Sequence, residues 1–217
     1  MSQNTTPIAT VTLSTTQQHL IEQGTINAPD SAKGRLLQAA ATLFKEKGYE
    51  RTTVRDLGKA VGIQSGSLFH HYPNKEAILK AVMEETILLN TELMKVALAA
   101  SPNPEGKVLA LIECELKSVL GETGAAMTVL VYEWRSLKEE NQQYILKLRE
   151  LYEDLWINAL NEAKDAGLVV IDPFVLRRLL TGALSWTVNW YRQEGNMTID
   201  QLAQMTLSLA IKPVQAH

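Results

Sequence analysis

Residues Lys47 to Ile78 read KGYERTTVRDLGKAVGIQSGSLFHHYPNKEAI, and this stretch decides the fold. Thr53 precedes Asp56 by three residues, which is the spacing of a capping box at the start of a helix. Gly62 lies where such a helix would end, because glycine readily adopts the left-handed conformation that follows many helix C-termini. The pattern therefore predicts a short helix over residues 54–61.

A second short helix is expected over residues 65–71, and Pro73 would end it. An amphipathic helix over residues 33–47 precedes both short helices. Two short helices joined by a glycine-containing turn form a helix-turn-helix, and the longer helix completes a three-helix unit. The second short helix of this motif enters the DNA major groove, and the small side chains of residues 65–67 would let it approach the bases.

The remaining sequence also has helical periodicity, so we expect an all-α protein with about nine helices. Asn74 is a favourable N-cap for a long helix that reaches about Ala100, where the sequence SPNPEG interrupts it. Glycines and Asp-Pro or threonine start signals separate the later segments. These segments are expected over residues 105–120, 124–137, 138–166, 173–193 and 199–211.

Three parts of the chain differ in composition. Residues 1–30 are rich in Thr, Gln and Ser, contain no Lys or Arg and lack an apolar stripe, so we expect a disordered tail. Residues 31–80 would form the helix-turn-helix domain, and residues 81–217 a helical bundle for ligand binding and dimerisation. The N-terminal stretch does not resemble a secretory signal, and no later apolar run could span a membrane, so a cytoplasmic protein without a membrane partner is expected.

The net charge of −3 hides an uneven distribution. Residues 30–80 contain nine Lys or Arg against five Asp or Glu, a net charge of +4, whereas residues 81–217 contain twelve against eighteen, a net charge of −6. A basic segment joined to a larger acidic one suits a head that binds a polyanion. A functionally neutral scatter of charges is the alternative.

Together, the Gly, Thr-Thr-Val, Gly-Ile, Ser-Gly-Ser-Leu-Phe and Asn-Lys-Glu elements of this stretch strongly resemble the DNA-binding domain of the tetracycline-repressor (TetR) family. The resemblance extends over residues 33–81. It implies a homodimer whose two recognition helices enter successive major grooves of a palindromic operator in double-stranded DNA. It also implies a small-molecule effector that binds in the C-terminal body and releases the operator, which would make the protein a ligand-responsive repressor.

The resemblance assigns roles to individual positions. It implies base contacts by Arg55, Ser65 and His70. It implies phosphate contacts by Thr53, Ser67, His71 and Lys75. The complete set expected to lie against DNA is Thr53, Arg55, Gln64, Ser65, Gly66, Ser67, Phe69, His70, His71 and Lys75.

The C-terminal part suggests an effector class. The segments YEWRSL (residues 132–137) and GALSWTVNWYR (residues 182–192) are similar to segments of the TetR branch that senses acyl-CoA thioesters. All four tryptophans fall in this part, and aromatic residues between helices can line an apolar chamber, although each could equally be ordinary core. The expected ligand-binding residues are Leu111, Cys114, Met127, Val131, Trp134, Trp156, Trp186 and Trp190.

The last two helical segments are apolar on more than one face, which predicts a homodimer interface over residues 173–211.

Other functional interpretations remain open. His70 and His71 point about 100° apart on a helix and could not easily share a metal ion, and the sequence contains neither a phosphate-binding loop nor a catalytic motif. No catalytic residue, metal or cofactor is therefore expected. A constitutive or partner-controlled DNA binder, or a helical enzyme, are the alternatives.

Overall fold

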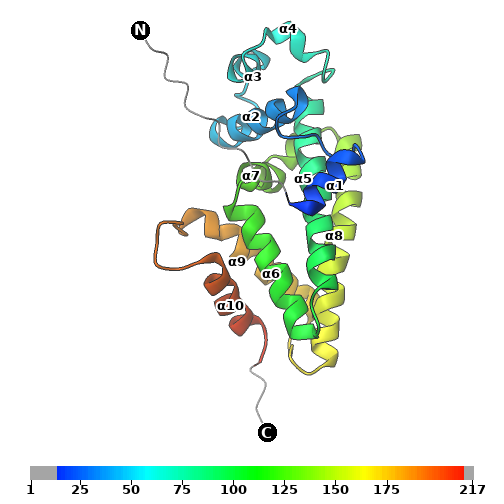
Figure 1. Cartoon of the computed structure of the whole chain (residues 1–217), viewed down its shortest axis with the longest axis vertical. Helices are drawn as coiled ribbons and strands as arrows, with labels where there is room; N and C mark the ends of the chain where they lie inside the picture. The colour runs from blue at the N-terminus through cyan, green and yellow to red at the C-terminus, as the bar shows by residue number, and fades with distance from the viewer. Residues whose placement is uncertain (1–13, 213–217) are drawn as a thin grey trace.

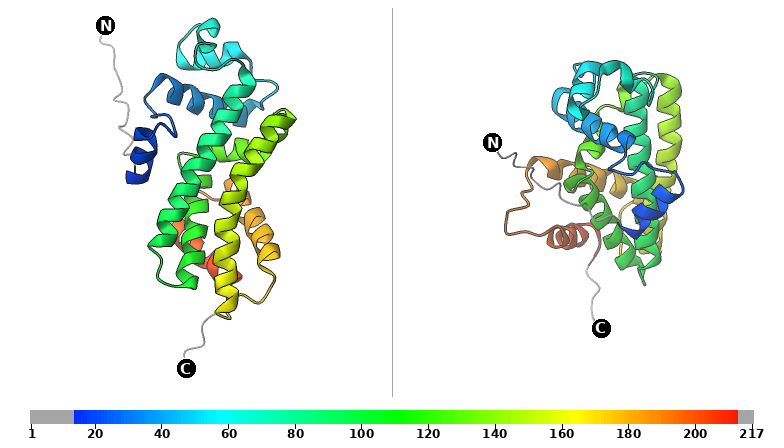
Figure 2. Two further views of the ribbon diagram at one scale, coloured as in Figure 1. Left: turned by 90° about the vertical axis from the view of Figure 1, so that its right-hand side faces the viewer. Right: turned by 45° about the horizontal axis from the view of Figure 1, so that its top comes forward.

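The computed structural model describes residues 14–212, and within this range the chain forms ten α-helices, two 3-10 turns and no strand. The prediction of an all-α protein is confirmed. Figures 1 and 2 show an elongated molecule with a small helical head at one end and a bundle of longer helices below it. None of the described helices is long and apolar enough to cross a membrane.

The head contains α2 (Ala32–Lys47), α3 (Val54–Val61) and α4 (Ser65–Leu68), which match the predicted three-helix unit. Gly62 ends α3 with φ of 73° and ψ of 26°, the left-handed conformation that the sequence suggested. α4 is shorter than predicted, because the chain turns after Leu68.

The long helix α5 (Lys75–Ala99) begins in the head and continues into the body (Figure 1). The predicted boundary at residue 80 falls inside this helix, and as a domain boundary it stays a prediction. The side chain of Asn74 accepts a hydrogen bond from the amide of Ala77 at 2.8 Å, so the predicted N-cap is present.

The body continues with α6 (Pro104–Leu120), α7 (Gly124–Tyr132) and α8 (Glu139–Asp165). It ends with α9 (Pro173–Trp186) and α10 (Ile199–Ala210). Two predicted segments are shorter than expected, because α7 passes into a 3-10 turn at Trp134–Ser136 and α9 into another at Thr187–Asn189.

Two apolar cores stabilise this arrangement. The upper core joins α2, α3 and α4 to α5, α7 and the start of α8, so the head and the body share buried side chains. The lower core lies between α6, α8, α9 and α10. Burial of apolar surface contributes roughly 25 cal/mol per Å², so these shared contacts fix the head on the body in this conformation.

The prediction of a disordered tail over residues 1–30 is wrong for its second half. Ser14 caps helix α1 (Thr15–Glu22), and Leu20 and Ile26 are buried against Leu89 of α5. No regular apolar stripe reveals this segment, because few apolar side chains, Leu20, Ile26 and the partly buried Ile21, hold it to α5. Residues 1–13 lie outside the described part of the chain.

Candidate DNA-binding surface and head-body cavity

The start of α3 is fixed by a complete capping box. The Thr53 hydroxyl oxygen accepts from the amide of Asp56 at 3.1 Å, and the Asp56 carboxylate accepts from the Thr53 amide at 2.9 Å. The bond from the Thr53 amide holds the pKa of Asp56 down to about 2. Arg55 lies in this first turn with its side chain exposed, and its role as a base reader stays a prediction.

The surface of α4 is small and polar, as the sequence suggested. Gly66 is exposed and the two serines beside it, Ser65 and Ser67, are half-buried. On the opposite side Leu68 is buried in the upper core and anchors the helix. Gln64 precedes α4 with an exposed side chain that makes no capping bond. The backbone of α4 can therefore lie close to another surface.

The residues that follow α4 extend this surface. Phe69 is 52% exposed although it is a large apolar side chain, and His70 is exposed beside it. His71 is half-buried and its amide bonds to the Leu68 carbonyl at 2.9 Å. An apolar ring and an imidazole held at the end of the recognition helix can pack against base or sugar edges in a groove.

Two of the predicted phosphate contacts do not fit this conformation. The Lys75 ammonium donates to the carbonyls of Tyr49 at 2.8 Å and Thr52 at 3.0 Å, so it fastens the loop between α2 and α3. The Thr53 hydroxyl donates its proton to Asp56 at 2.8 Å. A phosphate only accepts hydrogen bonds, so the Thr53 hydroxyl has no donor free for it. The three N–H donors of Lys75 all have carbonyl acceptors in this loop, the third being that of Glu50 at 3.5 Å.

Sequence reasoning missed a residue that joins the head to the body. Glu133, which follows α7, accepts a hydrogen bond from the Tyr49 amide at 3.2 Å and another from the Ser136 hydroxyl at 3.1 Å. No local pattern reveals the contact, because 84 positions separate Tyr49 from Glu133.

The eight predicted ligand-binding residues do not gather around one cavity. Leu111 and Trp156 are fully buried in the lower core, Met127 is buried in the upper core, and Cys114 is largely covered, which raises the pKa of its thiol to about 11. Trp134 is half-buried. The other three are exposed at the surface: Val131, Trp186 and Trp190.

The tryptophans lie apart for a geometric reason. Trp186 and Trp190 share a face only if one helix continues through both, but α9 ends at Trp186 and a 3-10 turn separates the pair. Trp156 is a core residue, with the Arg177 guanidinium 4.4 Å from its ring centroid.

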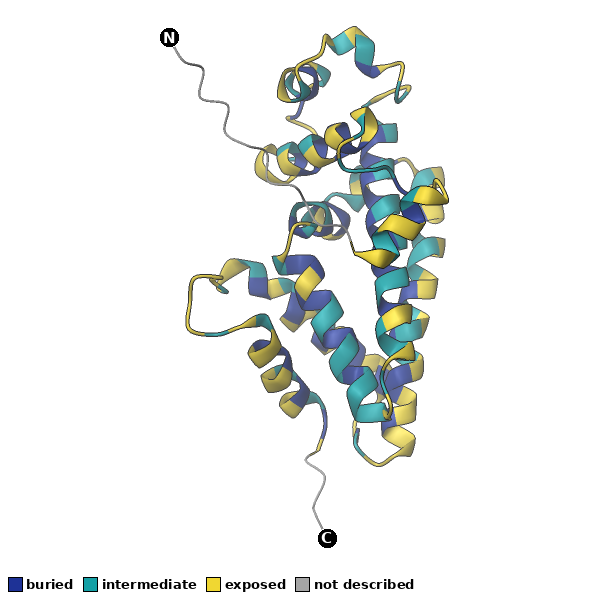
Figure 3. Cartoon of the chain, in the orientation of Figure 1, coloured by how far each residue is buried: buried dark blue, intermediate teal, exposed yellow. Residues whose placement is uncertain are grey.

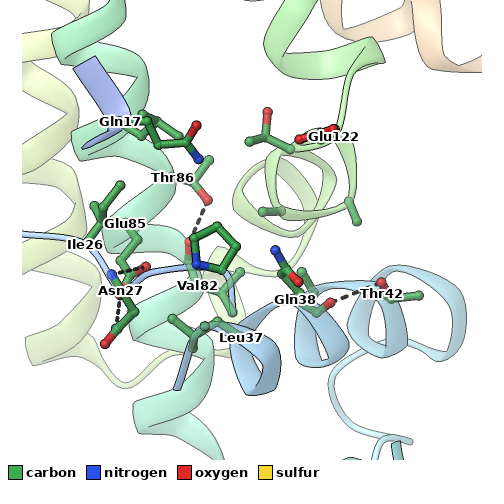
Figure 4. A pocket seen from close by; sticks show the side chains of 17 residues that line it. Gln17, Ile26, Asn27, Leu37, Gln38, Thr42, Val82, Glu85, Thr86 and Glu122 are labelled. Atoms are coloured by element: carbon green, nitrogen blue, oxygen red, sulfur yellow. Dashed lines mark hydrogen bonds between the residues drawn. The ribbon is translucent and has the colours of Figure 1, made fainter. Parts of the chain in front are cut away.

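A cavity of about 270 Å³ lies elsewhere, where the head meets the body (Figure 4). Its walls are α2, α5, the start of α7, and α1 with the segment that follows it. Figure 4 shows Asn27, Gln38, Glu85 and Thr86 around it together with apolar side chains such as Leu37. None of the eight predicted ligand residues lines this cavity. Its wall includes the segment that was expected to be disordered, which is why the sequence did not reveal it.

Comparisons with known proteins agree with this geometry. Residues 36–82 match the family model described as bacterial regulatory proteins, tetR family, and residues 101–214 match the model of the tetracyclin repressor-like C-terminal domain. The HTH-type transcriptional repressor KstR2 of Rhodococcus jostii strain RHA1 is 31% identical over 183 residues, which cover 81% of this chain and 87% of that protein.

Solved structures share the fold. The chain described as superantigen pfit is 49% identical, with a TM-score of 0.79 over 91% of this chain and 98% of its own. AibR, solved with isovaleryl coenzyme A and operator DNA, is 24% identical, with a TM-score of 0.76 over 84% of this chain and all of its own, and it shows the fold alone. Both domain matches and the KstR2 relationship show that the chain belongs to the TetR family of bacterial transcription regulators.

Proposed function

We propose that the protein is a dimeric, ligand-responsive repressor that binds a palindromic operator through α3 and α4. The observation that carries this proposal is the surface of α4, where small residues lie opposite a buried anchor, Leu68, together with the exposed side chain of Arg55 on α3. Such a helix fits the major groove, and an arginine can read guanine there with two hydrogen bonds. A regulator of this kind acts on DNA in the cytoplasm and has no catalytic step.

The proposed division of DNA contacts keeps the roles that the family resemblance implies, except at two side chains whose donors are already used within the head. Arg55, Ser65 and His70 are the base readers, whereas Ser67 and His71 contact phosphates. Lys75 and Thr53 support the head instead, because their donors are already used within it. Arg51 and Lys59 add exposed positive charge to the same part of the molecule, which attracts the phosphate backbone without reading sequence.

The dimer would form through α9 and α10. Figure 3 shows exposed positions along both helices, and they include Leu179 and Trp186 on α9 and Leu209 on α10. Leu209 is 89% exposed and Trp186 is 62% exposed, which is costly for such apolar side chains in a monomer. Pairing with the same two helices of a second copy would cover them in a four-helix interface.

The effector class is suggested by relatives. AibR was solved with isovaleryl coenzyme A, and KstR2 of Mycobacterium tuberculosis is described as a ketosteroid transcriptional regulator. An acyl-CoA would act if it bound better to a conformer whose recognition heads have the wrong separation. Coupling of about 1 to 3 kcal/mol would weaken operator binding roughly 5- to 150-fold.

Selection of bound duplexes from a random DNA pool tests this function directly. A palindromic site should be enriched, its affinity should fall steeply with salt, and isovaleryl-CoA or a long-chain acyl-CoA should release it. Arg55→Ala should relax the preference at one position of each half-site by about 1–3 kcal/mol, while Lys147→Ala in the body should change nothing. Failure to enrich any site would reject the regulator, and a palindrome that ignores both acyl-CoAs would reject only the effector class.

A further inference from the structure

The cavity between head and body is lined by residues of α2, α5 and α7. These helices would have to shift relative to one another for the DNA-binding helices to move. Leu37 and Ala41 of α2 form one wall, Val82 and Leu89 of α5 form another, and Ala126 of α7 lies among the remaining lining residues. All five belong to packed helices, so the apolar walls are already in place without a ligand. A volume of about 270 Å³ is near the lower end of small-molecule sites, which restricts the occupant to a small ligand.

The polar groups of this cavity are acidic or neutral. Among the described residues that line it, Glu85 and Glu122 are the charged ones, and neither Lys nor Arg occurs. The phosphate groups of an acyl-CoA would meet repulsion here, since like charges in a partly dry site destabilise one another. The site therefore selects against the effector class that the relatives suggest.

Glu85 is a charged residue on the polar side of the cavity. It is half-buried on α5, and its carboxylate accepts hydrogen bonds from the amide of Asn27, at 3.2 Å, and from the Asn27 side chain. Burial raises the pKa of Glu85, although the Asn27 bonds and the charge of Lys33 oppose the change. These interactions only partly offset the cost of burying the carboxylate charge. A hydrogen-bond donor or a positive charge placed beside the carboxylate would therefore stabilise it.

The segment that follows α1 closes this side of the cavity. Leu20 and Ile26 are buried against Leu89. Asn27 is held to Glu85 by hydrogen bonds (Figure 4). Gly34 of α2 touches the same segment, because a Cβ at this position would come within 2.0 Å of the Ala28 carbonyl oxygen. The N-terminal segment is thus a fitted wall of the cavity.

We infer that this cavity binds a small ligand with an apolar body and one cationic or hydrogen-bond-donating group, which contacts the Glu85 carboxylate. The apolar body packs between Leu37, Val82 and Leu89, and anionic ligands are rejected. Binding needs no DNA and so goes beyond the proposed function. Only a regulatory effect of the ligand, through displacement of α2 relative to α5 and α7, rests on that function.

Three six-carbon probes that differ only in their head group test the inference: hexylammonium, hexan-1-ol and hexanoate. Binding to the full-length protein without DNA is measured by titration calorimetry at pH 7. Hexylammonium should bind at least about tenfold more tightly than hexanoate, because each ~1.4 kcal/mol of head-group preference is a factor of ten. Nuclear Overhauser contacts from the hexyl chain should appear at methyl groups of Leu37, Val82 and Leu89.

Variants locate the site. Glu85→Gln should remove most of the preference for hexylammonium over hexan-1-ol, while Glu84→Gln, the same change one position earlier and outside the cavity, should leave it intact. Ala126→Leu should fill part of the cavity and weaken all three probes. The Overhauser contacts on the unaltered protein do not depend on whether that variant folds.

Equal binding of hexanoate and hexylammonium, or contacts to methyl groups elsewhere, would overturn the inference. Operator selection is performed without any probe, so a protein that selects a palindrome yet fails this test keeps its proposed function. A protein that binds hexylammonium at this site but selects no DNA would lose the proposed function and keep the site.

Discussion

The ammonium group of Lys75 lies 4.1 Å from the centroid of the Tyr49 ring and donates to the Tyr49 carbonyl at 2.8 Å. Lys75 is the first residue of α5, and Tyr49 lies in the loop between α2 and α3. The Tyr49 ring also packs edge-on against Phe44 in the upper core, with ring centroids 5.3 Å apart. A single cation therefore fixes the loop that leads into the DNA-binding helices.

Lys75→Met should destabilise the head without changing how DNA is read. The methionine keeps the apolar stem but loses the charged donor, and a hydrogen bond to a charged group contributes a net stabilisation of about 1.5–3 kcal/mol. We expect the free energy of unfolding to fall by about 1–3 kcal/mol in urea denaturation. The slope of operator affinity against salt should stay unchanged, because no phosphate contact is lost.

Lys147→Met on the exposed side of α8 is the matched control, and its stability should equal that of the unaltered protein. A drop in the salt slope of about one for Lys75→Met, with stability unchanged, would restore the phosphate contact that the sequence suggested.

Acid should loosen the start of α3 through Asp56. Its pKa is lowered to about 2 from an ordinary 3.8, mainly by the bond from the Thr53 amide. A carboxyl group with a depressed folded-state pKa stabilises the fold above its unfolded pKa, and this contribution is lost as pH falls through the folded value. Stability should therefore decline between about pH 4 and pH 2, and Asp56→Asn should show a smaller decline. Identical pH profiles of the two proteins in thermal unfolding would contradict this role.

Local signals in the sequence predicted the helix starts well. Thr53 with Asp56 and Asn74 with Ala77 act over three residues, so their geometry needs no knowledge of the rest of the fold. The three-helix head could be predicted for the same reason, because its turns and caps are contiguous in the chain.

Contacts between distant segments could not be predicted. Glu133 meets Tyr49 across 84 positions, and Asn27 meets Glu85 across 58. Lys75 illustrates the limit most clearly: its position at a helix N-terminus suggested a phosphate contact, but three carbonyls of a distant loop lie within 3.5 Å of its ammonium. Which partner a lysine takes depends on the tertiary structure around it.

The lower core contains a buried ion pair whose loss should be severe. The Arg177 side chain is 1% exposed and donates to Glu115, whose side chain is 4% exposed, at 3.1 Å. Tyr152 also donates to Glu115 at 3.1 Å. Arg177→Met would leave the Glu115 carboxylate buried without its cation, and removal of one partner of such a pair costs about 3–5 kcal/mol.

The neighbouring arginine provides the control for this prediction. Arg178 is more than half exposed and lies 3.8 Å from Glu153, so Arg178→Met should cost less than about 1 kcal/mol. Chemical denaturation monitored by tryptophan fluorescence compares the two variants directly, since Trp156 lies beside Arg177. Equal losses in both variants would mean that burial does not decide the strength of this pair.

The exposed apolar face of α9 and α10 should control assembly. Leu209→Glu places a carboxylate in the proposed interface, and burying an ionised group without a partner is unfavourable enough to prevent pairing. Sedimentation at micromolar concentration should show a dimer for the unaltered protein and a monomer for the variant. Leu151→Glu makes the same change at a 58% exposed leucine on α8, outside the interface, and should remain dimeric. The monomeric variant should bind a single half-site and the whole palindrome with equal affinity, because only a dimer holds two recognition helices at a fixed spacing. If Leu209→Glu still sedimented as a dimer, the interface would have to lie on other helices, and the exposure of Leu209 would need another explanation.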